Sequence, residues 1–139
     1  MLLAAGCGVV RPAVSASEMR LGESTAEVTE VGIVLALTNS GRDEVELVRY
    51  DYSVVLEDGA RYDGVWSAQR ALPPGRTVDA VIPAVLPTAS LARGGWRLEG
   101  TLRYRDPKSI ARILYEAGIL RTEVGFSGSG AVPAPDAPR

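Results

Sequence analysis

The chain has a single cysteine, Cys7, and no histidine among its 139 residues. A lone cysteine cannot form a disulfide within the chain, so Cys7 is an attachment point, a reactive thiol or an incidental residue of an N-terminal tail. Without histidine, the sequence lacks the commonest general base at neutral pH and the commonest metal ligand. Ser-His-Asp and Cys-His arrangements and the usual zinc sites are therefore excluded.

The residues before Cys7 favour its use as an attachment point. Bacterial lipoproteins carry an aliphatic residue and two small residues before a modified cysteine, and the stretch Leu3-Ala4-Ala5-Gly6-Cys7 is similar, with its leucine one place early. Small residues let a signal peptidase reach the backbone, and the thiol takes the diacylglycerol. No basic residue lies within three positions of Cys7 to promote the reactive thiolate, which argues against a redox or catalytic thiol.

A lipid on Cys7 would make the membrane a partner of this protein. Each buried CH₂ of an acyl chain adds about 0.8 kcal/mol, so a multiply acylated cysteine is a durable anchor. We expect residues 1–7 to be a shortened signal segment and residues 8–17 a flexible tether. Gly8, rather than Asp, after the cysteine favours a periplasm-facing outer-membrane lipoprotein of a bacterium. If Cys7 is not processed, the protein is expected in the cytoplasm.

Carboxylates are the remaining candidates for catalysis, and the chain has 17 Asp and Glu residues. Asp51, Asp58 and Asp63 fall around one predicted hairpin, where a pair could hydrolyse a glycan or bind calcium. However, Asp58 belongs to the turn, Asp63 is expected to be solvated, and no D-x-D-x-D-G spacing is present. Trp66 and Trp96 could stack on sugar rings, although packing in a core or edge is the commoner use of tryptophan. We therefore expect no enzymatic activity, no metal and no cofactor.

Charge is small overall but uneven along the chain. The net charge of −2 argues against nucleic acid as a partner. Residues 17–92 carry 6 Arg and 12 acidic residues, whereas residues 93–121 carry 7 basic and 3 acidic residues. Solvated strand and helix faces are one explanation of this basic segment, and an anionic surface such as lipid headgroups is the other. The candidates for that contact are Arg97, Arg103, Arg105, Lys108 and Arg112.

Residues 18–127 are predicted to form an antiparallel β-sandwich of the immunoglobulin or fibronectin-III type. β-Prone runs alternate with turn signals at the spacing typical of such sandwiches. The predicted strands cover residues 31–38, 45–56, 60–67, 77–86, 96–104 and 120–125. Alternation along them predicts these inward-facing side chains: Ile33, Leu35, Leu37, Tyr50, Tyr52, Val54, Trp96, Leu98, Leu102 and Tyr104.

Local signals mark the connections between the predicted strands. Asp58-Gly59 predicts a tight hairpin, and Pro83 predicts a sheet edge or a bulge. Asp106-Pro107 is typical of a helix start, and apolar residues at helical spacing follow, so we expect one short helix at about 107–117. Residues 128–139 hold Gly, Ser, Pro and Ala without a core former and predict a disordered tail.

Four segments resemble the type 2 late embryogenesis abundant family, also called the water-stress and hypersensitive-response domain. They are Val34-Leu35-Ala36-Leu37-Thr38-Asn39, the hairpin stretch Tyr50–Gly59, the turn and strand Leu72-Pro73-Pro74-Gly75-Arg76-Thr77-Val78, and Val124-Gly125-Phe126-Ser127-Gly128. Ser40 stands where the family usually has proline.

The resemblance implies a fibronectin-like sandwich with no catalytic residues to carry over. Bacterial members are often secreted or lipid-anchored, and the family name links them to desiccation and stress. The expected function is therefore a non-enzymatic, lipid-anchored envelope protein with a protective or binding role. The alternative is an envelope scaffold that docks another protein through a sheet edge or through the basic face of residues 93–121.

Overall fold

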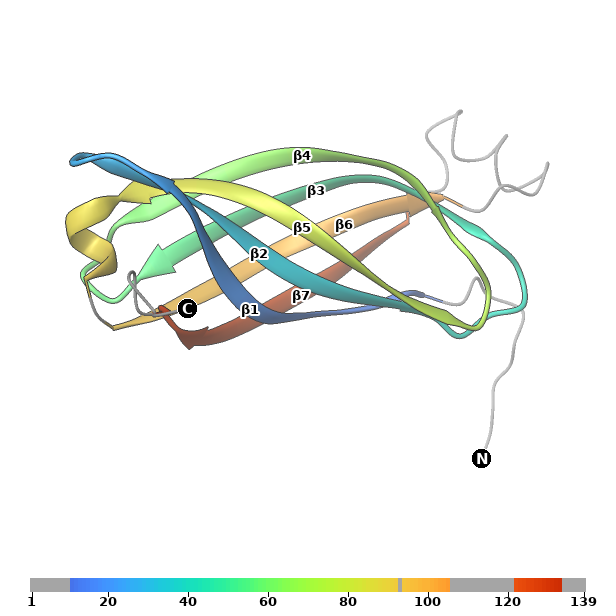
Figure 1. Cartoon of the computed structure of the whole chain (residues 1–139). Helices are drawn as coiled ribbons and strands as arrows, with labels where there is room; N and C mark the ends of the chain where they lie inside the picture. The colour runs from blue at the N-terminus through green and yellow to red at the C-terminus, as the bar shows by residue number, and fades with distance from the viewer. Residues whose placement is uncertain (1–10, 93, 106–121, 134–139) are drawn as a thin grey trace.

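The computed structural model describes residues 11–92, 94–105 and 122–133, which form two antiparallel sheets (Figure 1). The described elements are β1 (Ala13–Ser24), β2 (Val28–Asn39), β3 (Val45–Leu56), β4 (Arg61–Leu72), β5 (Arg76–Pro87), the short 3-10 turn η1 (Thr88–Leu91), β6 (Gly95–Arg105) and β7 (Glu123–Ala131). No helix in these ranges is long and apolar enough to cross a bilayer.

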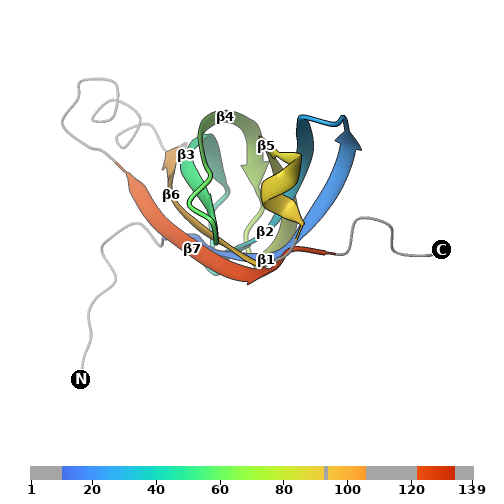
Figure 2. The same cartoon turned by 90° about the vertical axis from the view of Figure 1, so that its left-hand side faces the viewer.

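The two sheets pack as a sandwich, as the sequence predicts. One sheet has the strand order β1-β2-β5 and the other the order β4-β3-β6-β7. The chain crosses between the sheets at the β2–β3, β4–β5 and β5–β6 connections. An end-on view shows β1 and β7 side by side where the two sheets meet, and β4 and β5 on the opposite side of the sandwich (Figure 2).

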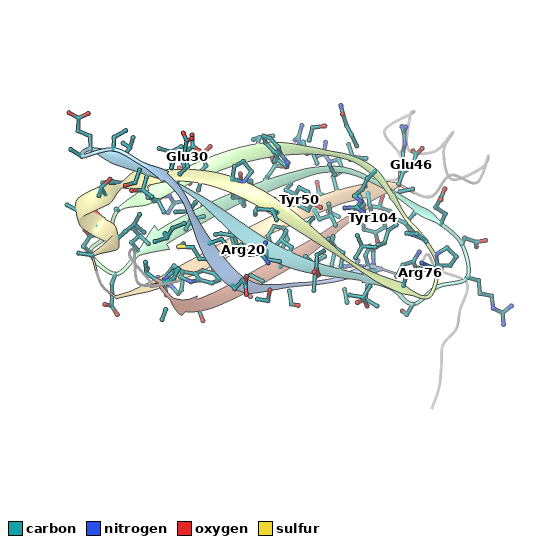
Figure 3. The ribbon with its side chains drawn as sticks, in the orientation of Figure 1. Arg20, Glu30, Glu46, Tyr50, Arg76 and Tyr104 are labelled. Carbon is teal, nitrogen blue, oxygen red and sulfur yellow. The ribbon has the colours of Figure 1, made fainter. Side chains whose placement is uncertain are left out.

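The core lies between the sheets and contains all the inward-facing residues that alternation predicts. Ile33, Leu35 and Leu37 of β2 are completely buried, and the β3 and β6 residues face them from the other sheet. Tyr50 and Tyr104 are the largest fully buried side chains (Figure 3). The hairpin at Asp58-Gly59 is confirmed, with Gly59 at φ 95°, and Pro83 lies on an edge strand.

β1 lies before residue 31, where the first strand predicted from the sequence begins, and is a strand that the sequence analysis misses. Residues 13–17 belong to the strand instead of a flexible tether, because their backbone pairs with β2 from Ala13↔Thr38 onward. Val14 and Ala16 pack against the core. These small residues carry little hydrophobic signal of their own, and pairing with a distant strand orders them.

β7 continues beyond the point where a disordered tail is predicted. It runs to Ala131, and Gly128 and Gly130 lie opposite Leu98 and Trp96 of β6. A Cβ at Gly130 would lie 3.1 Å from Cζ2 of Trp96, and a Cβ at Gly128 would overlap that of Ala16. The absence of side chains is therefore a packing requirement here, although composition alone predicts disorder.

The predicted helix at 107–117 lies outside the described residues. The strand predicted at 120–125 corresponds to the start of β7, which begins at Glu123.

Candidate functional site

The outer face of the four-stranded sheet is the candidate site, because the sequence-predicted carboxylates and arginines of β3, β4 and β6 meet there. Register places them in rows across the sheet. One row contains Asp63, Ser53, Glu99 and Ser127, and the next contains Val65, Asp51, Thr101 and Gly125. A shallow hollow of about 510 Å³ lies over these rows, lined in part by Asp51, Ser53, Asp63, Glu99 and Thr101.

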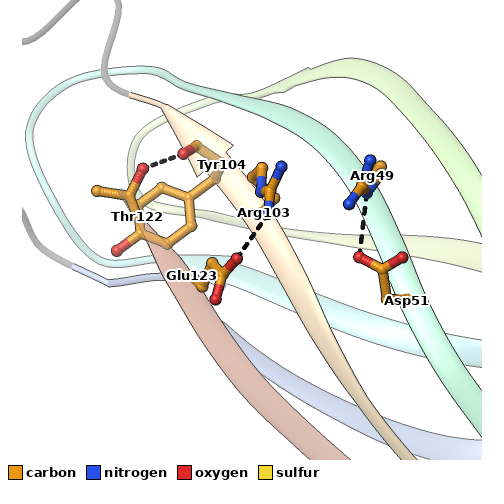
Figure 4. Close-up of polar contacts among 6 residues, drawn as sticks. All are labelled: Arg49, Asp51, Arg103, Tyr104, Thr122 and Glu123. Atoms are coloured by element: carbon orange, nitrogen blue, oxygen red, sulfur yellow. Dashed lines mark hydrogen bonds and ion pairs between the residues drawn. The ribbon is translucent and has the colours of Figure 1, made fainter. Parts of the chain in front are cut away.

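The carboxylates of this face are engaged by arginines. Arg49 Nε lies 3.0 Å from Asp51 Oδ2, and Arg61 Nε lies 2.9 Å from Asp63 Oδ1. On the same face, Arg103 lies opposite Arg49 in register, and Arg103 Nη2 is 2.9 Å from Glu123 Oε2 (Figure 4). Each of the first two pairs joins residues two apart on one strand, since alternate residues share a face.

Asp63 is held in its ionised form. Ser53 Oγ donates a hydrogen bond to Asp63 Oδ1 at 2.5 Å, and this bond, followed by that from Arg61, lowers the pKa of the Asp63 carboxyl. A hydrogen bond from Ser90 and another from the Ala60 backbone likewise lower the pKa of Asp58 at the hairpin turn. A glycosidase general acid needs a raised pKa. The pKa values of Asp58 and Asp63 are instead lowered, which does not suit either residue to that role.

The structure brings Asp51 and Asp63 to the same hollow and leaves Asp58 at the turn. Within the described ranges, no group of three or more Asp, Glu or Cys side chains is placed to hold a metal ion. Glu99 and Thr101 join the hollow from β6, which lies far from the hairpin in sequence. No local signal in the sequence points to these two residues.

The two tryptophans occupy different environments. Trp96 is only 2% exposed and belongs to the core, so it cannot stack on a sugar. Trp66 lies on the edge strand β4 and is 47% exposed. It is therefore the one accessible tryptophan of this chain.

The predicted basic candidates separate along β6. Arg97 lies toward the start of the strand, whereas Arg103 and Arg105 lie at its end. Arg103 pairs with Glu123, and Arg105 Nε lies 2.5 Å from Glu46 Oε1. Arg103 and Arg105 are therefore each engaged by a carboxylate. Lys108 and Arg112 lie outside the described residues.

The chain enters the sandwich at the end where β2, β4 and β6 finish (Figure 1). Cys7 lies outside the described residues, but Ala13 already pairs with Thr38 at this end. Exposed Arg76 marks the same end in Figure 3, and Glu30 lies toward the opposite one. The hairpin turns 24–28 and 56–61 therefore lie at the end of the sandwich opposite the start of β1.

Asn39 has a structural role. In the sequence it is recognisable only as part of a turn. Its side chain is buried, and Nδ2 donates to the carbonyls of Asp43 at 2.8 Å and Leu72 at 3.0 Å. Its Oδ1 accepts from the Gly41 backbone at 2.9 Å. One amide thus connects the end of β2, the loop after it and the end of β4.

Comparisons with known proteins concern the fold. No protein-family model matches the chain, and no curated protein sequence matches it. Several solved structures do match. The chain shares their fold. AT1g01470 from Arabidopsis thaliana has a TM-score of 0.62 and 13% identity over 93% of this chain and 87% of that chain.

Two further structures give the same result. A candidate late embryogenesis abundant (LEA) protein, At2g46140.1, has a TM-score of 0.65 and 12% identity over 89% of this chain and 71% of that chain. A protein from Archaeoglobus fulgidus has a TM-score of 0.56 and 13% identity over 86% of this chain and 93% of that chain. At such identities the likeness shows a common sandwich fold.

Proposed function

We propose that this chain is a non-enzymatic protein of the bacterial cell envelope, anchored by a lipid on Cys7, whose sandwich protects neighbouring molecules during water loss. The observation that carries the proposal is the charge mosaic, by which we mean Arg49, Asp51, Arg61 and Asp63 with the hydroxyls of Ser53 and Thr101 on the outer face of the four-stranded sheet. The fold that the chain shares with a candidate LEA protein supports the stress role.

The charge mosaic suits a surface that must tolerate drying. Exposed ion pairs contribute little to folding stability, so these pairs have little structural purpose. Their charges balance, which avoids a strong single-sign field that would attract or repel macromolecules. Hydroxyl and carboxylate oxygens can accept and share hydrogen bonds with a neighbouring surface as water leaves.

The anchor would hold the sandwich close to the membrane. Only residues 8–12 separate Cys7 from the start of β1 at Ala13. A fully extended chain of that length spans about 20 Å. The end that contains Asn39 and the Leu72–Arg76 turn would therefore face the lipid, and the 24–28 and 56–61 turns would point outward.

The anchor is tested by expressing the gene with its native upstream DNA in a related bacterium, with Cys7 or with Cys7→Ser. Envelope fractions are separated, and the mature N-terminal peptide is weighed by mass spectrometry. We expect a diacylglyceryl-modified Cys7 in the membrane fraction and a soluble Cys7→Ser protein. An unmodified Cys7 in soluble protein would rule out the anchor.

The protective role is tested with the purified Cys7→Ser chain, which needs no membrane. A labile enzyme is dried and rehydrated with this protein or with an equal mass of albumin, and its recovered activity is measured. We expect higher recovery with the sandwich. Recovery equal to that with albumin would refute protection without affecting the anchor.

A further inference from the structure

Acidic side chains gather at one end of the sandwich, which we call the hairpin end because the turns 24–28 and 56–61 lie there. Hydrogen bonds hold its connections together. The Thr88 backbone donates to the carbonyl of Glu27 at 3.0 Å, and the Ser90 hydroxyl donates to the carboxylate of Asp58. Five exposed carboxylates, none paired with an arginine among the described residues, lie in these turns or on the strands beside them: Glu23, Glu27, Glu30, Glu57 and Asp58.

The opposite end, at which β1 begins, carries arginines. We call it the anchor end, because the proposed lipid attachment precedes it in the chain. Its exposed arginines lie around the end of β2 and form no ion pair within the described residues: Arg11, Arg42 and Arg76. Arg76 lies opposite Asn39 in register. Burial raises the pKa of Tyr104 and the Arg11 charge partly offsets that rise, so Arg11 lies near the end of β6.

The two ends therefore differ in charge. Asp43 and Glu44 are also exposed at the anchor end, so its three positive and two negative charges leave a balance of +1. The hairpin end has five negative charges over the same part of the chain. A strand of 12 residues such as β2 separates the ends by about 40 Å. This separation is several times the Debye length of about 8 Å at physiological ionic strength, so a charged surface acts on one end at a time.

We propose that an anionic lipid surface holds the anchored sandwich upright, with the anchor end on the headgroups and the hairpin end directed away from the membrane. This inference rests on the lipid anchor of the proposed function and adds the force that orients the sandwich. An upright sandwich keeps its hairpin-end carboxylates beyond the field of the headgroups. A sandwich lying on its side would bring some of them close to like charge.

The competing contact is the outer face of the three-stranded sheet, where Val81 and Val85 are 47% and 43% exposed. Apolar side chains of this kind favour the interface of a bilayer. However, register places Val85 opposite the exposed Glu30. Exposed Val28 of the same sheet directly follows Glu27. Carboxylates thus border these valines, so an anionic bilayer opposes the side-on contact, whereas a neutral bilayer does not.

The test couples the full chain through Cys7 to a maleimide lipid in supported bilayers. Neutron reflectometry then measures the thickness of the protein layer on phosphatidylcholine and on phosphatidylcholine mixed with phosphatidylglycerol. Upright strands give a layer of about 40 Å, and a sandwich on its side gives roughly 25 Å. We expect the thicker layer on the anionic bilayer and a thinner one on the neutral bilayer. Because the coupling is chemical, a failure of lipid attachment in cells would leave this result unaffected.

Two matched variants test whether charge at the hairpin end is the cause. Glu23→Lys, Glu27→Lys adds two changes of +2 at that end, and Glu44→Lys, Asp79→Lys adds the same charge toward the anchor end. On the anionic bilayer we expect the first variant to lose the thicker layer and the second to keep it. Circular dichroism checks that both fold. Equal parent layers on the two bilayers, a thin parent layer on the anionic bilayer, or equal layers of the two variants would overturn the proposal.

Discussion

At the scale of single residues, Asn39 shows how one buried side chain can join three segments. Its amide donates to the carbonyls of Asp43 and Leu72 and accepts from Gly41, and its own carbonyl accepts from the Gly75 backbone at 2.6 Å. The bond to Gly41 is the local turn that Asn favours. The bond to Leu72 reaches a residue 33 positions away.

Replacing Asn39 with alanine should therefore destabilise the domain. Asn39→Ala leaves two carbonyls and one N–H without their buried partner, and we expect a loss of about 3 kcal/mol of unfolding free energy. Urea denaturation measures it. Exposed Ser40→Ala is the control, with an expected change of about 0.5 kcal/mol or less. Equal effects of the two substitutions would contradict this role.

Buried tyrosines make stability depend on alkaline pH. Burial raises the pKa of Tyr50, Tyr52 and Tyr104 above the ordinary value of 10.0, and nearby Tyr62 raises that of Tyr52 further. The folded state therefore keeps these protons at a pH where the unfolded chain has lost them. Their contribution to stability is complete below about pH 10 and is lost as the pH rises further.

We expect the unfolding free energy to fall steeply between about pH 10 and pH 12. Urea titrations at a series of pH values measure it, and phenolate absorbance reports ionisation. Tyr52→Phe should make the fall shallower and should cost about 1 kcal/mol at neutral pH, because its bond to Pro83 is lost. Ionisation of every tyrosine near pH 10 in the folded protein would contradict the prediction.

At the scale of elements, the contact between β1 and β7 closes one side of the sandwich. It depends on small residues, because a Cβ at Gly128 of β7 would overlap the Cβ of Ala16 of β1. These two strands come from the ends of the described chain. Their contact joins the N-terminal and C-terminal strands without a hydrogen-bonded ladder between them.

Adding one methyl group at this contact should separate the strands. We expect Gly128→Ala to reduce the unfolding free energy by about 2 kcal/mol through overpacking. Ala16→Gly in the same chain removes the clashing methyl and should restore part of that loss. A double-mutant cycle measures the coupling, and additive effects of the two substitutions would show that the strands do not meet in this way.

At the scale of the whole molecule, the two outer faces are chemically different. The charge mosaic covers the four-stranded sheet, whereas the three-stranded sheet exposes Val81 and Val85 with a single ion pair, Glu18–Arg20 at 2.6 Å, among its described residues. The effect of removing ion pairs can therefore be compared between the two outer faces of one protein.

Removing two ion pairs from the charge mosaic should weaken protection and preserve the fold. The variant Arg49→Gln, Asp51→Asn, Arg61→Gln, Asp63→Asn keeps the net charge, and exposed pairs contribute little to stability. We expect an almost unchanged melting curve and a drop of enzyme recovery after drying to the level of albumin. The pair Glu18→Gln, Arg20→Gln should leave recovery unchanged. The opposite ranking would place protection on the other sheet.

The sequence by itself determines the features that depend on near neighbours. Alternation assigns Ile33, Leu35 and Leu37 to the core because successive side chains of a strand point to opposite faces. The turn at Asp58-Gly59 follows from the freedom of glycine at positive φ. Pro83 marks an edge strand because it lacks a donor.

Only the tertiary structure decides features whose partners are distant in sequence. The small residues 13–17 and the Ser-Gly repeat of β7 have no hydrophobic periodicity. They form strands because their backbones pair with β2 and β6. The hollow of the charge mosaic forms because β3–β6 register brings Glu99 opposite Ser53. The edges of β1 and β7 protect each other, and no short stretch of sequence contains that contact.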